Sequence, residues 1–391
     1  MGVKFVDTGA RRYVAGTVKQ FDQKNEMFCR PLWDEEMLDL GKKFYMTDVP
    51  PKDKAGYRLR DQAMVNAAWH LENNFAQGVA GGRMGMYAWE WDKIFEFPLV
   101  PPGLTIDIND PIEVTRDIKK TATFFGASLV GVCRLDKSWV YSSAFPLRDQ
   151  KSVPNELPDE YKYAIALAFE MDYKAIGCSP TSPASAATGL GYSKMAFTAG
   201  LLAHYIRGLG YKAIACGNDT ACSIPIAIDA GLGELGRNGL LITPQYGPRV
   251  RLAKIFTDLP LVPDSPIEFG VWDFCMICGK CAQKCPSQSL MHGEPSAEVH
   301  NISNREGVHA WHINAETCLP FWAANGTDCS NCIRACPFNK PPGLLHEFVR
   351  WGIKNTPWLD KMFLWGDDLF GYGKPKKADD FWETWKPRGG H

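Results

Sequence analysis

The stretch Asp273–Pro286, DFCMICGKCAQKCP, places four cysteines within eleven residues and ends in a proline. The spacing is C-x2-C-x2-C-x3-C-P. A second group follows at Cys318, Cys329, Cys332 and Cys336. It repeats the C-x2-C-x3-C-P half, and ten residues separate its first two cysteines. Two such runs are typical of a bacterial ferredoxin with two [4Fe–4S] clusters, where the fourth cysteine of each run binds the other cluster.

This crossed pattern predicts two ligand sets. One cluster is assigned to Cys275, Cys278, Cys281 and Cys336, and the other to Cys285, Cys318, Cys329 and Cys332. Zinc is the alternative, because C-x2-C pairs also bind zinc, but the x2-x2-x3-P spacing favours iron–sulfur clusters. The five other cysteines stand in apolar or small-residue surroundings and are expected to be buried free thiols: Cys29, Cys133, Cys178, Cys216 and Cys222.

The region upstream of the cysteines predicts a layered α/β or α+β domain. A helix is expected to begin at Asp110, with Pro111 in its first turn and Glu113 closing a capping box, and to run to Phe125. Apolar runs predict strands at 128–135, 163–171 and 211–217, helices at 184–208 and 224–231, and two strands joined by a turn at 246–248 within 239–261. Residues 1–110 indicate loops and short helices that contribute to a pocket.

Four regions follow from this pattern: a wrapping segment at 1–110, a catalytic domain at 111–264, a cluster domain at 265–345 and a tryptophan-rich tail at 346–391. The cluster domain is about a fifth of the chain, so the remainder is expected to use the electrons. The tail is expected to wrap over the protein's own surface, or else to contact a membrane-anchoring partner.

The glycines of Gly231-Leu-Gly-Glu-Leu-Gly236 match G-x-G-x-x-G, but the segment follows a predicted helix and leads into a strand. A dinucleotide fingerprint requires the reverse order. Gly231, Gly233 and Gly236 are therefore predicted to form a tight turn where the backbone approaches a large cofactor.

Composition excludes some functions. The net charge of −1 gives no electrostatic case for nucleic-acid binding. No apolar run approaches the roughly 18 residues of a membrane-spanning helix. Arg11-Arg12 is followed by no apolar stretch, so the start of the sequence is not expected to be an intact export signal.

The chain resembles the corrinoid- and iron–sulfur-dependent reductive dehalogenases. The resemblance covers about residues 110–345 and rests on IEVTRDIKKTATFFGASLVGVCRLD, on TGLGYSKMAFTAG through RVRLAKIFTDLPL, and on the two cysteine runs; DDLFGYGK in the tail is also similar. It implies a nitroreductase-like cobalamin-binding domain fused to a ferredoxin-like domain, with the corrinoid buried and base-off. The sequence lacks D-x-H-x-x-G, the motif that places histidine on cobalt.

The resemblance implies a catalytic trio of Tyr192, Asn218 and Arg251. A guanidinium beside the phenol would stabilise phenolate and make Tyr192 a usable proton donor, and the amide could hold the phenol oxygen or the halogen. Arg249 is expected to face the same side of a strand as Arg251, so the choice between them rests on the resemblance. Pocket-lining positions are expected at Trp322, Thr188, Trp89, Trp91, Phe28 and Trp33.

The implied reaction is the two-electron, one-proton replacement of C–Cl by C–H in small chlorinated aliphatic hydrocarbons, in organohalide respiration. The implied partners are a small membrane-anchor protein, a respiratory electron donor and a second copy in a homodimer. The implied location is the outer face of the cytoplasmic membrane, after twin-arginine export of a longer precursor, with the cytoplasm as alternative. Two other functions compete: an epoxyqueuosine-reductase-like enzyme, which would need an acidic catalytic residue and a basic tRNA surface, and a non-catalytic electron-transfer protein.

Overall fold

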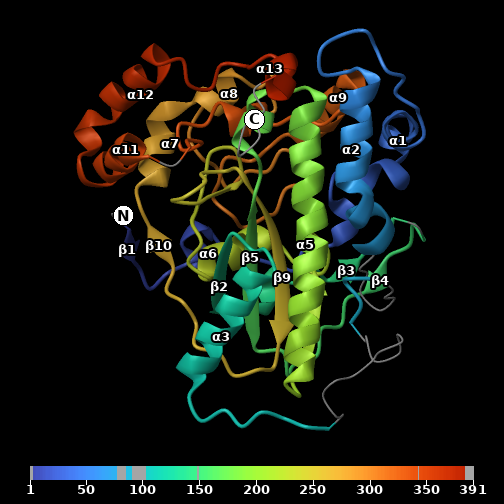
Figure 1. Ribbon diagram of the computed structural model, residues 1–391, viewed down its shortest axis with the longest axis vertical. Helices are drawn as coiled ribbons and strands as arrows, with labels where there is room; N and C mark the ends of the chain where they lie inside the picture. The colour runs from blue at the N-terminus through green and yellow to red at the C-terminus, as the bar shows by residue number, and fades with distance from the viewer. Residues whose placement is uncertain (1–2, 77–84, 90–102, 148, 342, 384–391) are drawn as a thin grey trace, which may run out of the picture.

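A four-stranded antiparallel sheet forms the centre of the protein. The computed structural model describes residues 3–76, 85–89, 103–147, 149–341 and 343–383 (Figure 1). The strands are arranged in the order β2 (Leu129–Arg134), β5 (Tyr163–Glu170), β9 (Val250–Thr257) and β6 (Ala213–Cys216). The predicted strands at 128–135, 163–171 and 211–217 are thus confirmed, and so is the mixed α/β class.

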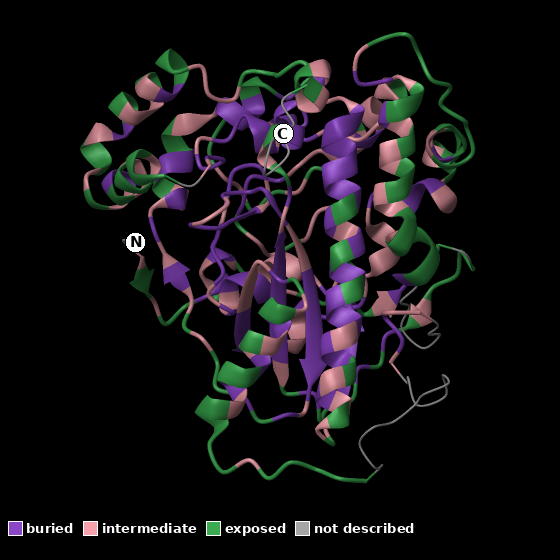
Figure 2. Ribbon diagram, in the orientation of Figure 1, coloured by how far each residue is buried: buried purple, intermediate pink, exposed green. Residues whose placement is uncertain are grey.

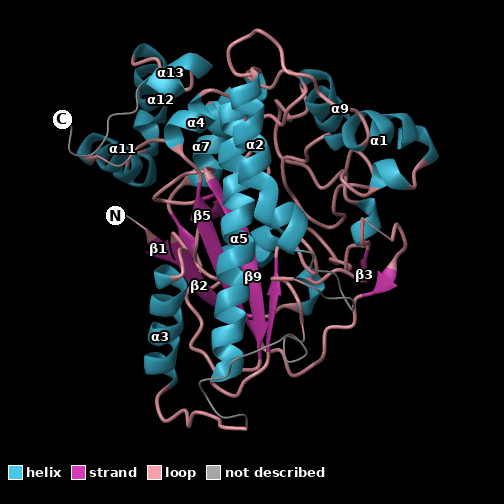
Figure 3. Ribbon diagram, turned by 45° about the vertical axis from the view of Figure 1, so that its right-hand side comes forward, coloured by secondary structure: helices cyan, strands magenta, loops and turns pink. Residues whose placement is uncertain are grey.

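The two faces of the sheet differ in side-chain size. Along β5, Ile165, Leu167 and Phe169 face one side, and Ala164, Ala166 and Ala168 face the other. The large residues pack against α3 (Pro111–Phe124) and the long helix α5 (Ser182–Gly208). The small alanine side chains leave room on their face for α6 (Ser223–Asp229) and for the N-terminal residues Ala10 and Tyr13. Figure 3 shows α5 lying along the sheet, and Figure 2 shows the strands as the most deeply buried elements.

Two local predictions were wrong. Asp110 caps α3 by accepting from the Ile112 N–H, but Glu113 does not reach back, because it binds Arg116 on the exposed face at 3.0 Å. The segment 239–261 is not a hairpin: β8 (Leu241–Ile242) pairs with β7 (Glu234–Leu235), whereas β9 pairs with β5 and β6.

Short helices beyond the sheet carry Cys275, Cys278, Cys281, Cys318 and Cys332, and the loops next to them carry Cys285, Cys329 and Cys336. These helices are α7 (Val271–Cys278), α8 (Lys280–Gln283), α9 (Ala315–Asn325) and α10 (Asn331–Arg334). The N-terminal segment joins this region to the rest, because β1 (Lys4–Phe5) pairs with β10 (Ile267–Glu268). As expected, residues 3–76 form mostly loops and short helices. The helices are α1 (Leu38–Tyr45) and α2 (Leu59–Leu71), and α2 continues into a π-helical turn at Glu72–Ala76. The 3-10 turns are Ala10–Tyr13, Gln23–Asn25, Arg30–Leu32 and Glu35–Met37. Two further short ladders pair β3 (Ser143–Ala144) with β4 (Val153–Pro154) and β7 with β8, and a 3-10 turn spans Lys137–Trp139.

The tail forms α11 (Leu344–Asn355), a 3-10 turn Pro357–Leu359, α12 (Asp360–Leu369) and α13 (Ala378–Glu383). Only part of it lies flat on the protein. Trp382 donates to Asp61 at 2.8 Å, so α13 wraps as expected, whereas Trp351 on α11, Trp358 on the 3-10 turn and Trp365 on α12 are exposed. Trp385 lies outside the described residues. Among the described helices, none is long and apolar enough to cross a membrane.

Candidate active site and electron-transfer centres

Tyr192 and Asn218 meet at the edge of the sheet. Tyr192 lies on α5, and Asn218 lies on the loop that follows β6. The side-chain amide of Asn218 donates to the phenol oxygen of Tyr192 at 2.8 Å. The phenol ring is held from its other side by Trp69 of α2, which stacks on it with a centroid distance of 4.9 Å. Trp69 was missed because its segment carries no motif or periodic pattern.

Arg251 joins the same group from strand β9. It pairs with Phe169 across the ladder, so both side chains are on the α5 face of the sheet. Its guanidinium carbon lies 5.2 Å from the Tyr192 ring centroid, and its Nη2 donates to the Thr188 hydroxyl at 3.3 Å. Gly191 makes this approach feasible, because a Cβ there would lie 2.8 Å from Arg251 Cγ. The Asp328 carboxyl lies near this guanidinium; burial raises its pKa, and Arg251 acts in the opposite direction.

Arg249 has a different environment from Arg251. It is fully buried just before β9, where it binds Glu170, the Met171 carbonyl and Asn339. These contacts hold its Nε and Nη1 away from Tyr192, while its buried Nη2 has no hydrogen-bond partner among the described residues. The structure therefore separates two arginines that the sequence alone left equivalent.

Some of the predicted pocket residues come together, and others do not. The rings of Phe28 and Trp322 are 5.7 Å apart, and Trp322 also lies against the Cys318 sulfur. Trp33 instead donates to the Lys24 carbonyl at 2.7 Å, and Trp89 packs on the opposite, alanine-bearing face of the sheet. Trp91 lies outside the described residues.

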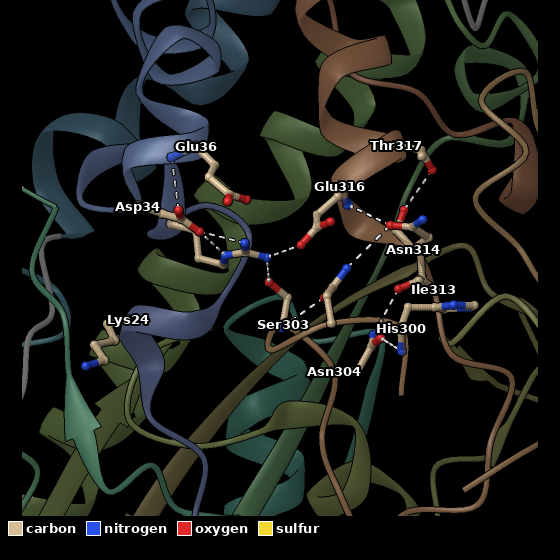
Figure 4. A network of polar contacts seen from close by, with 12 residues as sticks. Lys24, Asp34, Glu36, His300, Ser303, Asn304, Ile313, Asn314, Glu316 and Thr317 are labelled. Atoms are coloured by element: carbon tan, nitrogen blue, oxygen red, sulfur yellow. Dashed lines mark hydrogen bonds and ion pairs between the residues drawn. The ribbon is translucent and has the colours of Figure 1, made fainter. Parts of the chain in front are cut away.

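A polar network joins the segment that follows Phe28 to the start of α9 (Figure 4). Arg30, which is 5% exposed, donates to Asp34 at 2.6 Å and to Glu316 at 2.6 Å. Glu316 stands at the start of α9, the helix that carries both Cys318 and Trp322. The N-terminal segment is thus fastened to the helix beside one cluster site.

The eight cysteines form two groups. Cys275, Cys278, Cys281 and Cys336 line one pocket together with Phe274 and Phe338. The second group contains Cys285, Cys318, Cys329 and Cys332, whose sulfurs lie close enough to interact electrostatically. These are the two crossed sets proposed from the spacing.

The donor set fits iron–sulfur clusters. Within the described residues, no group of three or more Cys, His, Asp or Glu side chains converges on the position of a single ion. A [4Fe–4S] cluster instead takes four thiolates around a larger core. The Arg237 N–H points at Cys275 Sγ (3.5 Å) and the Ser289 N–H at Cys285 Sγ (3.3 Å), contacts of the kind that tune cluster potentials. Burial raises the pKa of Cys278 and of Cys318 to about 12, so cluster binding would displace protons from these thiols.

The second cysteine group is the one beside the candidate catalytic residues. Asp328, adjacent in sequence to Cys329, faces both Arg251 and Thr188. The first group lies in a different core, where Cys275 and Cys336 pack with Trp311 and Ile353. The second group therefore shares its surroundings with Arg251 and Thr188.

The side chains of the trio differ in exposure. Asn218 is exposed although its neighbours Gly217 and Thr220 are buried, and Tyr192 is half-buried. The buried Nε of Arg251 has no hydrogen-bond partner in the described part of the chain. Asn218 and Tyr192 are therefore the members of the trio that a corrin could contact.

The three glycines of the 231–236 segment are explained without a cofactor. A Cβ at Gly231 or Gly233 would meet the carbonyl of Ser265 or Ile242 at 2.6 and 2.1 Å, and one at Gly236 would meet the Ile242 side chain. Gly231 also has a φ of +73°, which favours glycine. The tight turn is present, and a contact with cobalamin stays a prediction.

Comparisons with known proteins agree with this picture. The family model of a 4Fe-4S double cluster binding domain matches residues 274–339, which include all eight cysteines. The chain is 36% identical over 365 residues to tetrachloroethene reductive dehalogenase of Sulfurospirillum multivorans, covering 85% of this chain and 72% of that protein. Epoxyqueuosine reductase of Bacillus subtilis is 29% identical over only 29% of this chain.

Solved structures share the fold. The catabolic reductive dehalogenase NpRdhA in complex with 3-bromo-4-hydroxybenzoic acid matches with a TM-score of 0.71 at 23% identity over 96% of this chain. A reductive dehalogenase structure interpreted in terms of B12-dependent dehalogenation matches with a TM-score of 0.70 at 23% identity over 95% of this chain. The chain spans about half the length of these solved proteins, 49% in both cases.

Proposed function

Because this chain belongs to the reductive dehalogenase family, we propose that it replaces a carbon–chlorine bond by carbon–hydrogen in small chlorinated aliphatic hydrocarbons. The reaction consumes two electrons and one proton and releases chloride. The observation that carries the proposal is the convergence of Asn218 and Arg251 on the Tyr192 phenol, beside the second cysteine group.

The family's cofactors are two [4Fe–4S] clusters and a corrinoid. When bound, reduced cobalt supplies the electrons that cleave the carbon–halogen bond. The eight cysteines would hold the clusters, and the exposed edge of Tyr192 and Asn218 would face the corrin.

The side chains of the trio would deliver the proton. Tyr192 carries it on its hydroxyl. Asn218 donates to the phenol oxygen, which leaves the O–H free to point at the substrate. As the proton departs, the Asn218 amide and the Arg251 guanidinium stabilise the phenolate that remains.

Two observations support small chlorinated aliphatic substrates. Phe28 and Trp322 offer apolar, aromatic walls, which suit a halocarbon that makes no hydrogen bonds. The relative named above acts on tetrachloroethene. Aryl halides are the competing class.

The test is anaerobic turnover of the cluster- and corrinoid-loaded protein with reduced viologen as donor. Chloromethanes, chloroethanes, chloroethenes and chlorophenols are compared, and released chloride is measured. Chloride release from at least one aliphatic substrate is expected. Turnover of chlorophenols alone would refute the substrate class, and no turnover of any halide would refute the activity.

A role in organohalide respiration is part of the same proposal, with a membrane-anchor protein and a respiratory donor as partners. It is supported by the exposed apolar side chains of α11, α12 and the 3-10 turn between them, which carries Trp358 at 79% exposure. The corresponding location is the outer face of the cytoplasmic membrane, and a homodimer could also cover this surface. We expect this chain to co-purify with a membrane protein from native cells, and we expect the membrane protein to be lost when Trp358 and Trp365 are replaced by serine. If the membrane protein still co-purifies with the substituted chain, this surface does not bind it.

The two competing functions are distinguished by simple measurements. A non-catalytic electron carrier would purify with iron and sulfide but without cobalt. An epoxyqueuosine reductase would turn over a modified tRNA, and it would not require Tyr192.

A further inference from the structure

The loop that presents Asn218 is held in a strained conformation. Thr220, a β-branched residue, has a φ of +69°, which costs energy unless its surroundings impose it. Asp219 folds back on the loop, accepting from the Gly217 N–H at 2.7 Å and from the Thr220 hydroxyl at 3.0 Å. The direction of the Asn218 side chain therefore depends on what fixes this turn.

Lys254 fixes the first residue of the turn from beneath the sheet. It lies on β9, three residues after Arg251, and pairs with Ala166 and Cys216 across the two neighbouring ladders. Its side chain is fully buried, and its Nζ donates to the Gly217 carbonyl and to the Ser223 hydroxyl at 3.1 Å. From opposite faces of the sheet, Arg251 thus reaches Tyr192 and Lys254 reaches Gly217, the residue that precedes Asn218.

The buried ammonium group of Lys254 has acidic neighbours. Asp219 and Glu26 face it, as do the thiols of Cys216 and Cys222. Burial lowers the pKa of Lys254, and burial raises the pKa of Asp219 and that of Glu26, the latter to about 7. Burying a charged group costs free energy because the group loses its hydration. Proteins retain buried charged groups where a defined geometry is needed.

Tyr141 holds the remaining part of the turn. Its hydroxyl donates to Glu26 at 2.5 Å and lies 3.3 Å from the Asn218 carbonyl. Its backbone N–H donates to the Thr220 carbonyl at 2.9 Å, and the Asn155 amide reaches the same oxygen at 2.8 Å. The carbonyls of Gly217 and Thr220 therefore each accept from a buried donor, and the Tyr141 hydroxyl lies next to the carbonyl of Asn218.

We propose that Lys254 is a positioning residue of the active site, which sets the Asn218 amide on the Tyr192 phenol by fixing the Gly217 carbonyl. Glu26 and Tyr141 complete this support from the N-terminal segment and from the region after β2. The inference rests on the proposed function, since it assigns Lys254 a role in the proton delivery by Tyr192. Lys254 itself touches neither substrate nor cofactor.

The test compares Lys254→Met, Asn218→Ala and the double variant in the loaded holoenzyme. Lys254→Met is expected to lower kcat by about 100-fold, the size of effect that a misplacement of about 1 Å can cause, with little change in KM. Because Lys254 acts through Asn218, the double variant should be no slower than Asn218→Ala. A crystal structure of Lys254→Met should show the amide of Asn218 out of hydrogen-bonding distance of Tyr192.

Two outcomes overturn the proposal. One is a double variant whose fold-loss in kcat equals the product of the losses in the two single variants. The other is an unchanged Asn218–Tyr192 hydrogen bond in the Lys254→Met crystal structure. Should Lys254→Met fail to fold, Tyr141→Phe replaces it in the same cycle, with an expected loss of roughly five-fold, the value of one hydrogen bond. Lys212→Met is the control, because that lysine forms an exposed pair with Glu160. If the parent enzyme has no dehalogenase activity, the proposed function is refuted. The positioning role of Lys254 is still tested by comparing the crystal structures of the parent and of Lys254→Met.

Discussion

The amide of Asn218 donates to the phenol oxygen of Tyr192 at 2.8 Å, while Arg251 lies 5.2 Å from the centre of the same ring. Both groups stabilise a negative charge on that oxygen more than they stabilise the neutral phenol. The arrangement is therefore suited to a tyrosine that gives up a proton during each turnover.

Replacing Tyr192 by phenylalanine should remove the proton donor and leave the fold intact. Since general acid catalysis contributes roughly 100- to 10,000-fold, kcat for chloride release should fall by at least about 100-fold. Iron and cobalt contents should not change. Tyr211→Phe is the control, because its hydroxyl binds only the Ile106 carbonyl among described partners. Full turnover by Tyr192→Phe would remove Tyr192 from the mechanism.

Arg251→Met and Arg249→Met should have opposite consequences, although the two positions are neighbours. Arg251→Met should lower kcat with little effect on the thermal midpoint, because the guanidinium serves the phenol. Arg249→Met should reduce the free energy of unfolding by on the order of 3 kcal/mol, because Glu170 and Asn339 lose a fully buried partner. Equal losses of stability in the two variants would contradict the separation of roles.

Pairs of cysteine substitutions should reveal the crossed ligation. Cys275→Ala combined with Cys336→Ala removes ligands of one predicted cluster, so about four of the eight irons expected for two clusters should remain. Cys275→Ala combined with Cys285→Ala affects both clusters and should leave little iron. Iron and sulfide analysis with electron paramagnetic resonance measures the difference. The reverse ranking of iron contents would establish sequential ligation.

Glu72 should make the protein less stable as the pH rises. Burial raises the pKa of this carboxyl to about 8, so the folded state retains a proton that an unfolded chain releases near its usual value of 4.5. Its stabilising contribution is therefore present at low pH and is lost as the pH rises through about 8. Glu72→Gln should flatten the decline of the thermal midpoint between about pH 5.5 and pH 8.5. Glu113→Gln, on an exposed pair, is the control, and an unchanged slope in Glu72→Gln would contradict the assignment.

Local patterns predicted the cysteine ligand sets and the central strands, because cluster ligands obey fixed spacings and a run such as 163–171 is apolar enough to indicate a buried strand. The trio was predicted from the family resemblance. The strands are confirmed, whereas the ligand sets and the roles of the trio stay predictions. Prediction failed where the outcome depended on distant partners: β9 pairs with β5 and β6, and Trp89 packs on the alanine-bearing face of the sheet.

Only the tertiary structure decided which arginine serves the site and what supports it. Alternation along one strand leaves Arg249 and Arg251 equivalent; the packing of α5, with Gly191 against Arg251, and the buried partners of Arg249 distinguish them. Trp69 and Lys254 carry no motif, and they reach the site because helix packing and strand register bring them there. Spacing along the chain fixes which residues can bind one cluster, whereas contacts between residues far apart in sequence exist only once the whole chain has folded.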